Sequence, residues 1–350
     1  MKGMMGKLAT VVAALALAMG GNGATADPLR VLTDRTDSGT MRPIFDAFEK
    51  ETGTKIEAVF IDQGLLARLT SRPTEADVVI TTDAELLEIA RQRGLLAPLP
   101  AVALQGIPAE FLGADAMYFV DAYRARAIIT SKARVPATAI ATYEDLAKPE
   151  WKGRLCVRSG LHDYNVALFD QFVASWGAAK ARTVIAGIAA NLARPPKGND
   201  REQANAIQQG ICDVALLNTY YYPKMLANPE QKAWAEAVRL IFPDQNGKGT
   251  FIMRSAVGIT KAMGNRALAE KLAAYMATPA VQTLIVDKTQ QYSVLPSVAA
   301  HPSMVEAAGA QGIKDGRFKI DLVSLANMAA SREEAIRIVN EVGFDNGPRK

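Results

Sequence analysis

The chain has 350 residues, with 40 Lys and Arg, 36 Asp and Glu, two His and two Cys. Because the opposite charges nearly balance and are interspersed, neither nucleic acid nor an anionic membrane is indicated as a partner. So few His and Cys residues nearly exclude a zinc or copper site of the usual kind, and a bound metal ion would need oxygen ligands.

Residues 1–26 have the pattern of a secretory signal peptide. Two lysines precede an apolar stretch at residues 8–19, and residues 24–26 (ATA) form an A-x-A cleavage site. We expect cleavage after Ala26, export to the periplasm, and a mature chain of net charge +2 once both lysines are removed. No later stretch is long enough to cross a bilayer, so direct membrane insertion is not expected.

The remaining 324 residues are enough for about two domains. In chain order, the pattern predicts strands at 29–33, 55–61, 77–81, 124–130, 155–158, 212–217 and 251–260. Helices are predicted over 41–53, 65–69, 83–94, 143–146, from 163 onward, 178–193 and 200–209, with a mainly helical C-terminal part. This alternation predicts an α/β fold, with mixed, mostly parallel sheets covered by helices on both faces.

Three consecutive tyrosines, at 220–222, follow the predicted strand at 212–217. Ligands in open α/β sheets bind at the carboxyl ends of strands. Two phenols that converge there would form an oxygen-only site, which suits a highly charged cation. The alternative is that these tyrosines are half-buried packing residues with a hydrated hydroxyl group.

A second tyrosine has the same spacing from a cysteine. Cys156 precedes Tyr164 by eight residues, and Cys212 precedes Tyr220 by eight. Both strands would therefore deliver a tyrosine to the same end of the sheet. Tyr164 would lie in the opening turn of a helix, where the macrodipole favours an anionic group, and a bound cation would lower the pKa of the phenol. The two cysteines could form a disulfide in an oxidising compartment or remain unpaired buried strand residues.

Several segments resemble those of a known family. The general ones lie at 45–53, 76–79, 94–99 and 143–154, and the sharper ones at 158–165, 213–222 and 243–250. In order and position they resemble the periplasmic ferric-iron-binding proteins of ABC-type iron importers, which are the tyrosine-rich group of the two-lobed solute-binding proteins. The likeness covers nearly the whole mature chain.

This resemblance implies a periplasmic-binding-protein-like fold of type II, with two α/β lobes and the ligand in the cleft between them. We expect strands to cross between the lobes near 124–129 and 251–257. The expected division is an N-lobe at 27–125, a C-lobe at 126–253, an N-lobe return segment at 254–300, and C-terminal helices at 301–350 that brace the C-lobe.

Carried over position by position, the resemblance makes Tyr164, Tyr220 and Tyr221 the ligands of Fe³⁺. Tyr222 would pack or hydrogen-bond beside them, and Tyr123 would lie in the layer behind the ligands. Three phenolates balance the charge of the ferric ion, and affinity should fall in acid because binding releases protons. The implied protein is a monomer that delivers the ion to an ABC permease in the inner membrane.

The sequence departs from the family after the first strand. Members of the tyrosine-rich group often carry a His-Tyr pair after an arginine, whereas here Arg35 is followed by Thr36 and Asp37. Asp37 is either a carboxylate ligand or a helix cap, and the N-lobe could instead offer only water or a small anion.

Some relatives bind carbonate or another synergistic anion beside the iron, held by arginines. Arg35, Arg124 and Arg126 match family positions for this role, and all three could alternatively be ordinary salt-bridging or hinge residues. His162 precedes Tyr164 by two residues, but a lone histidine in a loop is usually solvated, so we do not expect it at the site.

Two other classes of function are alternatives to iron binding. A solute-binding protein of the same fold could capture a polyamine, sulfate or phosphonate with Asp or Arg in the same cleft. An enzyme is not expected, because the mature chain has no G-x-S-x-G elbow, P-loop or G-x-G-x-x-G motif.

Overall fold

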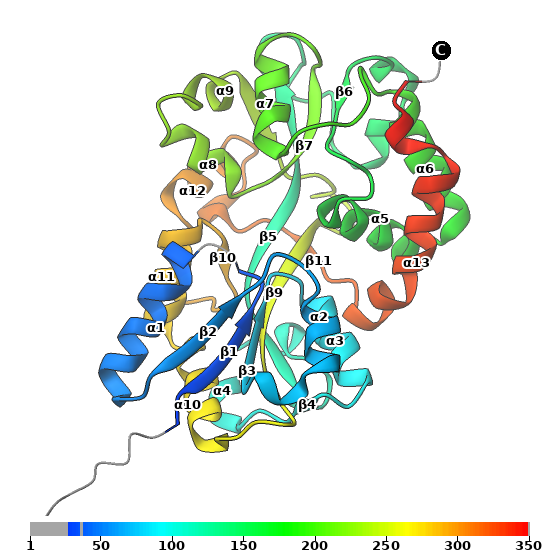
Figure 1. The fold of residues 1–350 in the computed structure, drawn as a ribbon. Coiled ribbons are helices and arrows are strands. Elements are labelled where there is room, and N and C mark those ends of the chain that lie inside the picture. The colour runs from blue at the N-terminus through cyan, green and yellow to red at the C-terminus, as the bar shows by residue number, and fades with distance from the viewer. Residues whose placement is uncertain (1–26, 36–37, 349–350) are drawn as a thin grey trace, which may run out of the picture.

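The computed structural model describes residues 27–35 and 38–348, which form two lobes joined by long strands (Figure 1). The expected signal peptide, its cleavage after Ala26, and Asp37 lie outside these residues. Within these ranges no helix has both the length and the apolar character needed to span a bilayer.

The lower lobe in Figure 1 is built on three parallel strands. β1 (Leu29–Thr33) lies between β2 (Ile56–Phe60) and β3 (Val78–Thr81), with Leu29 opposite Ile56 and Val31 opposite Val78. Its helices are α1 (Ser38–Thr52), α2 (Leu65–Ser71), α3 (Ala84–Gln92), α4 (Ala101–Leu104), α10 (Arg266–Met276) and α11 (Pro279–Thr289). Helices α1, α10 and α11 lie on one side of the sheet, and α2 and α3 on the other (Figure 1). The short strands β4 (Leu96–Ala97) and β10 (Tyr292–Ser293) extend the sheet.

Two long antiparallel strands run through both lobes. β5 (Tyr118–Ser131) pairs with β9 (Thr250–Thr260) from Tyr118 opposite Gly258 to Ala125 opposite Ile252. From Arg126 onward, β5 pairs instead with β7 (Val214–Asn218) and β8 (Val238–Ile241) of the upper lobe. β5 therefore passes from one sheet to the other.

The upper lobe completes its sheet with β6 (Leu155–Cys156), which is parallel to β7, and β11 (Ile320–Asp321), which pairs with β9. Its helices are α5 (Asp163–Trp176), α6 (Ala178–Ala190), α7 (Asp200–Gln208), α8 (Tyr221–Leu226), α9 (Lys232–Glu236), α12 (Pro302–Gly309) and α13 (Leu325–Glu341). α7 begins where the sequence places a capping box, because Asn199 accepts from the Glu202 N–H while Glu202 accepts from the Asn199 N–H.

The two-lobed α/β architecture is confirmed, and three details differ from the expectation. Antiparallel pairing is more extensive than expected, because the long strands β5 and β9 cross between the lobes in opposite directions. The strand expected at 155–158 has two residues, since the chain leaves the sheet after Cys156 to begin α5. The helix expected at 143–146 is a single 3₁₀ turn at Glu144–Ala147.

β5 also begins six residues earlier than the pattern at 124–130 predicted. Asp121 interrupts the apolar run, which hid this part of the strand in the sequence. Its carboxylate is fully buried and paired with Arg35, at 2.7 Å between Oδ1 and Nη2. A buried charge of this kind is tolerated because it is paired.

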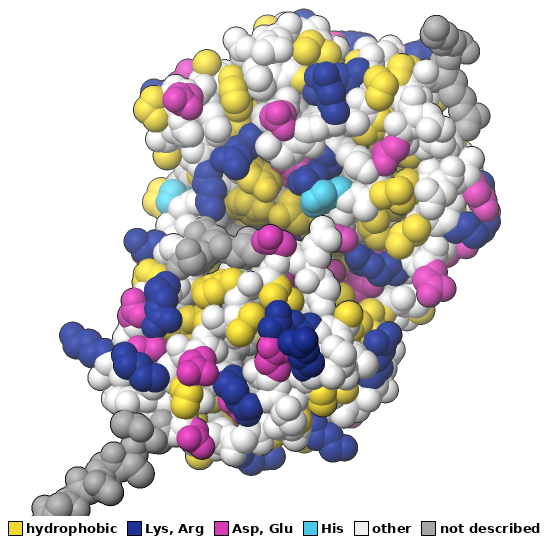
Figure 2. Space-filling model, viewed as in Figure 1, with side chains coloured by type: hydrophobic (Ala, Val, Ile, Leu, Met, Phe, Trp, Pro, Cys, Tyr) yellow, Lys and Arg dark blue, Asp and Glu magenta, His cyan; other side chains and the backbone are white. Residues whose placement is uncertain are grey.

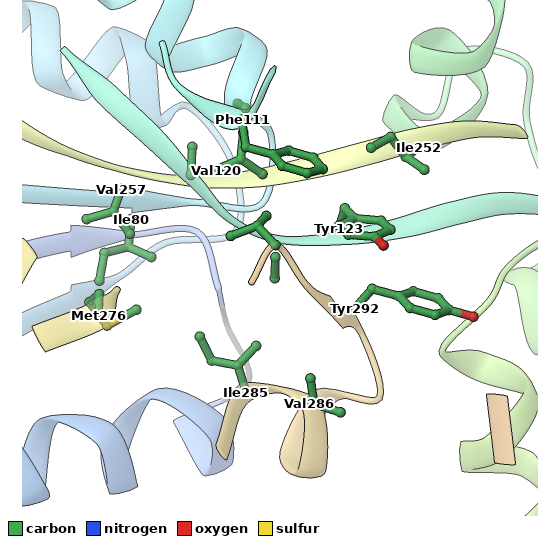
Figure 3. Close-up of a cluster of buried hydrophobic side chains, with 14 of the residues drawn as sticks. Ile80, Phe111, Val120, Tyr123, Ile252, Val257, Met276, Ile285, Val286 and Tyr292 are labelled. Atoms are coloured by element: carbon green, nitrogen blue, oxygen red, sulfur yellow. The ribbon is translucent and has the colours of Figure 1, made fainter. Parts of the chain in front are cut away.

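The described residues form two hydrophobic clusters. The larger fills the lower lobe and continues into the upper lobe, for example at Ile129, Ile207 and Leu240, and the smaller lies in the upper lobe. Figure 3 shows part of the larger one, where Ile80 and Val257 of the sheet face Met276 of α10 and Ile285 of α11. The C-terminal helix α13 contacts more than the upper lobe: it packs against α5 and also against α3 of the lower lobe (Figure 1).

Candidate metal centre

The turn after β7 carries two of the expected ligands. Thr219 fixes this turn to β5, because its N–H donates to the Ala125 carbonyl at 3.1 Å and its Oγ1 accepts from the Ala125 N–H at 3.2 Å. Tyr220 follows directly, and Tyr221 is the first residue of α8. The register of β5 and β7 therefore places both phenols where β5 passes from the lower lobe to the upper lobe.

Tyr164 comes from the first turn of α5. The N-cap of this helix is His162, whose Nδ1 accepts from the Tyr164 N–H at 3.2 Å. The imidazole also contacts the Tyr164 ring edge-on, with 4.7 Å between ring centroids. The expectation that His162 lies in solvent, away from the site, is wrong. Its position two residues before Tyr164, at a helix start, was the signal that could have located it.

The three phenols converge. The hydroxyl oxygens of Tyr164 and Tyr220 are 3.2 Å apart, and the rings of Tyr220 and Tyr221 lie with centroids 4.3 Å apart. Tyr222 faces elsewhere. Its ring packs against the larger hydrophobic cluster, and burial, followed by the negative charges of Glu306 and Glu236, raises the pKa of its hydroxyl. The predicted group of three therefore assembles, and Tyr222 is a packing neighbour.

A disulfide joins the strands that lead to these tyrosines. Cys156 of β6 and Cys212, just before β7, are bonded, with 5.9 Å between their Cα atoms. Cys212 precedes β7, whose other end leads to Tyr220, and Cys156 is the last residue of the parallel neighbour β6. The pairing that the sequence left open is thus present.

Positive side chains surround the phenols. The guanidinium groups of Arg158, Arg126 and Arg124 lie 4.9, 5.8 and 5.9 Å from the centre of the Tyr164 ring. Arg201 and Lys224 lie 5.4 Å from the rings of Tyr221 and Tyr220, respectively. Of these five, the sequence predicted no site role for Arg158, which begins a family-like segment, or for Arg201 and Lys224, because no local pattern marks a charged side chain that faces a ring.

Desolvation keeps two phenols neutral in the absence of a cation. Burial and the neighbouring phenols Tyr164 and Tyr221 raise the pKa of Tyr220 well above its usual range. Burial, then the proximity of Tyr164, raises the pKa of Tyr221 to about 12. Arg124 acts in the opposite direction on Tyr220. A bound cation would reverse the balance, because it stabilises phenolate oxygen directly.

The three expected anion-binding arginines differ in their contacts. Arg126 is fully buried and bonds to Asp200, Asn218 and Asn165, which favours the salt-bridging alternative for this residue. Arg35 is held by Asp121.

Arg124 is placed at the cleft wall. Its Nη1 donates to the Thr82 carbonyl at 2.7 Å and to Ser255 Oγ at 3.2 Å. It therefore contacts the lower lobe from a crossing strand, beside Tyr164.

Tyr123 lies apart from this group. Its ring stacks on Phe111 and Tyr292, at centroid distances of 5.6 and 5.2 Å, and meets Phe318 edge-on. Figure 3 shows Tyr123 beside Tyr292 within the hydrophobic cluster. Because neighbouring residues of a strand point to opposite faces, Arg124 reaches the cleft and Tyr123 does not. The contacts of Tyr123 do not place it behind the phenols.

A cleft between the lobes contains the phenols. A cavity of about 530 Å³ is lined by Tyr164, Tyr220 and Tyr221 on one side. The lower lobe contributes Asp34, Arg35, Thr40, Asp62, Gln63 and Thr82. Figure 2 shows hydrophobic and basic side chains around the hollow between the lobes. Among residues 27–35 and 38–348, no three His, Cys, Asp or Glu side chains are placed to hold a metal ion. The three phenols are therefore the candidate metal ligands in this cleft.

Residues 29–288 match the family of bacterial extracellular solute-binding proteins. The chain belongs to this family. This solute-binding protein is 33% identical to iron uptake protein A1 of Synechocystis sp. over 312 residues. The aligned region covers 87% of this chain and 84% of the relative.

Solved structures agree with the fold. The apo ferric ion-binding protein A of Pasteurella haemolytica superposes with a TM-score of 0.82 at 37% identity, over 91% of this chain and 99% of that one. A Trichodesmium protein in complex with iron and citrate gives a TM-score of 0.81 at 30% identity, again over 91% and 99%. The expected family and two-lobed fold of this solute-binding protein are therefore confirmed.

Proposed function

We propose that this protein is the periplasmic component of an ABC importer, which captures ferric iron through Tyr164, Tyr220 and Tyr221 and delivers it to a membrane permease. The observation that carries the proposal is the convergence of three phenols in the interlobe cleft, with 3.2 Å between the hydroxyl oxygens of Tyr164 and Tyr220. Ferric iron is the cargo, and the protein acts as a monomer.

The chemistry of the donor set favours a trivalent ion. Three phenolates balance three positive charges with hard oxygen atoms, which oxygen-preferring cations require. The surrounding cationic side chains add to the stability of the phenolate form. Relatives named for iron uptake and ferric-ion binding support the same assignment.

The lower lobe would complete the coordination. We infer that Arg124, with Arg35 nearby on the cleft wall, holds carbonate or another small anion beside the iron. Asp37 is proposed as a carboxylate ligand from the same lobe. Closure would bring these groups to the phenols, with residues 27–125 and 254–300 moving against 126–253 about the crossing strands β5 and β9.

An absorption titration with ferric nitrilotriacetate tests the proposal. We expect a visible phenolate-to-iron charge-transfer band that saturates at one equivalent of iron. Tyr164→Phe and Tyr220→Phe should weaken both the band and binding, by at least about tenfold, or about 1.4 kcal/mol.

Tyr222→Phe is the matched control, because Tyr222 follows the two proposed ligands but its hydroxyl lies near Glu306 and Glu236. It should leave the band unchanged. A wild-type protein without any band would refute ferric binding, and an organic or anionic ligand such as a polyamine, sulfate or phosphonate would then be the function to test.

A further inference from the structure

A group of charged side chains connects the two lobes away from the phenols. Asp83 and Glu85 open helix α3 of the lower lobe, and Asp163 and Asp170 belong to α5 of the upper lobe. Arg332 reaches all four from α13. We call these five residues the interlobe charge cluster.

Arg332 bridges the lobes directly. Its Nη1 lies 3.3 Å from Glu85 Oε2 and 3.7 Å from Asp83 Oδ2 in the lower lobe. On the upper lobe, Nη2 lies 3.3 Å from Asp163 Oδ1, and Nη1 lies 3.9 Å from Asp170 Oδ2. One guanidinium therefore contacts carboxylates on both sides of the interface, from a helix that is itself packed on both lobes.

Glu85 and Asp170 form the buried centre of the cluster. Both residues have 0% exposure, and their carboxyl groups interact with each other across the interface. Within the described part of the chain, Glu85 Oε1 and both oxygens of Asp170 have no hydrogen-bond donor. Two carboxyl groups can hydrogen-bond only if one carries a proton. A shared proton would therefore satisfy otherwise unpartnered buried oxygens.

The surroundings favour such a proton. Burial, followed by the charge of Asp83, raises the pKa of Glu85 to about 7. Burial and Glu85 raise the pKa of Asp170 well above its usual range. The groups that face the pair are Asp83 from α3, Arg332 from α13, Arg254 from β9 and, through Arg332, Asp163.

We propose that Arg332 and the Glu85–Asp170 pair form a proton-linked connection between the lobes, which helps to set the interlobe angle alongside the crossing strands. With one proton, the pair hydrogen-bonds across the interface and Arg332 balances the remaining charge. Without that proton, two adjacent buried carboxylates repel each other across the interface. Mild acid therefore favours the joined arrangement, and higher pH favours separation.

Distances between the lobes in the metal-free protein test this proposal. Nitroxide labels on Glu57→Cys in the lower lobe and Glu230→Cys in the upper lobe replace exposed residues, and the native cysteines are already bonded. Pulsed electron paramagnetic resonance then reports the interlobe distance at about pH 5 and about pH 8, on either side of the titration. We expect the wild-type distribution to move to longer distances at the higher pH.

Different variants test the role of the shared proton and the role of Arg332. Glu85→Gln and Asp170→Asn mimic a protonated partner, so each should abolish the shift and keep the shorter distances. Arg332→Gln should broaden the distribution at both pH values. Arg337→Gln is the control on the same helix, since Arg337 is exposed and, among the described residues, pairs with Glu334 and Glu341 of α13 itself.

Circular dichroism confirms that each variant is folded, and the two carboxyl variants are independent of each other. A wild-type distribution that does not change with pH would overturn the proposal, as would an unchanged shift in Glu85→Gln and Asp170→Asn. A distribution of Arg332→Gln identical to that of Arg337→Gln would exclude the role of the arginine. Because no iron is present, these results are independent of the ferric titration.

Discussion

Tyr220 and Tyr221 lie half-buried in a cleft wall, where desolvation disfavours the phenolate form. Cationic side chains stand against the rings of both, and against that of Tyr164. At the scale of the residue, the phenols of Tyr220 and Tyr221 are therefore neutral without a cation, and a bound cation would favour their phenolate form. In the proposed function, this difference would let the same residues both bind and release an ion.

His162 should act on the site through Tyr164. His162→Ala removes the N-cap of α5, so we expect a loss of about 1 kcal/mol in unfolding free energy and a weaker ferric charge-transfer band. His162→Asn restores a side chain that can cap the helix and should recover both properties. Urea denaturation and the iron titration measure these effects. Equal behaviour of the two variants would argue against a capping role.

Arg126 should contribute to stability more than to ligand binding. Arg126→Met leaves the buried Asp200 with only Arg158, at 3.4 Å, as a cationic partner, which should cost up to about 3–5 kcal/mol in unfolding free energy. Arg337→Met removes exposed ion pairs to Glu334 and Glu341 and should change the unfolding free energy far less. Urea denaturation compares them. If Arg126 mainly held an anion, Arg126→Met would instead change iron binding and leave stability intact.

At the scale of elements, β6 and β7 act as one unit. They are adjacent and parallel, they are joined by the Cys156–Cys212 disulfide, and each leads to a segment that carries a proposed iron ligand. Helix α5 begins beside Tyr164 and helix α8 begins at Tyr221. The N-termini of both helices therefore lie near each other, beyond the C-terminal ends of two linked strands. The disulfide thus supports the scaffold from which the site is presented.

Replacing both cysteines by serine should measure this support. The bond closes a separation of 56 residues, so its loss should lower the unfolding free energy by about 4 kcal/mol in the chain-entropy description. Denaturation of the oxidised wild type gives the reference, and the fully reduced wild type should match the double variant. A double variant as stable as the oxidised protein would contradict a stabilising role.

At the scale of the whole molecule, the lobes are connected by β5, β9, the chain between β10 and α12, and the helix α13. The strands provide a continuous backbone path, whereas α13 provides side-chain contacts to α3 and α5. Opening of the cleft must therefore rearrange the interlobe charge cluster as well as bend the strands. Charge and lobe geometry are coupled at this contact.

Stability should depend on pH through Glu85. The pKa of Glu85 is raised to about 7, so the folded protein holds this proton more tightly than the unfolded chain. The resulting stabilisation is complete below the unfolded pKa and is lost as pH rises to about 7. Between about pH 5 and pH 8, the wild type should lose on the order of 1–3 kcal/mol relative to Glu85→Gln. Parallel declines of both proteins in urea denaturation would contradict this assignment.

The sequence by itself determined much of the local structure and the identity of the phenol group. Periodicity located β1, β3, α3 and most other elements, because these patterns reflect which face of each element is buried. The equal spacing of Tyr164 and Tyr220 from their cysteines predicted that both reach the same end of two strands, and the strands are indeed neighbours. Resemblance to a family then gave the two-lobed fold.

Only the tertiary structure decided how side chains from distant segments pair. It directed Arg124 to the cleft and Tyr123 to the core, joined Cys156 to Cys212, and placed His162 beside Tyr164. It also brought Glu85 and Asp170 together under Arg332, across an interface that no local pattern encodes. The physical reason is common to all of them: periodicity reports burial along one element, whereas charge pairing and convergence depend on which elements the fold makes neighbours.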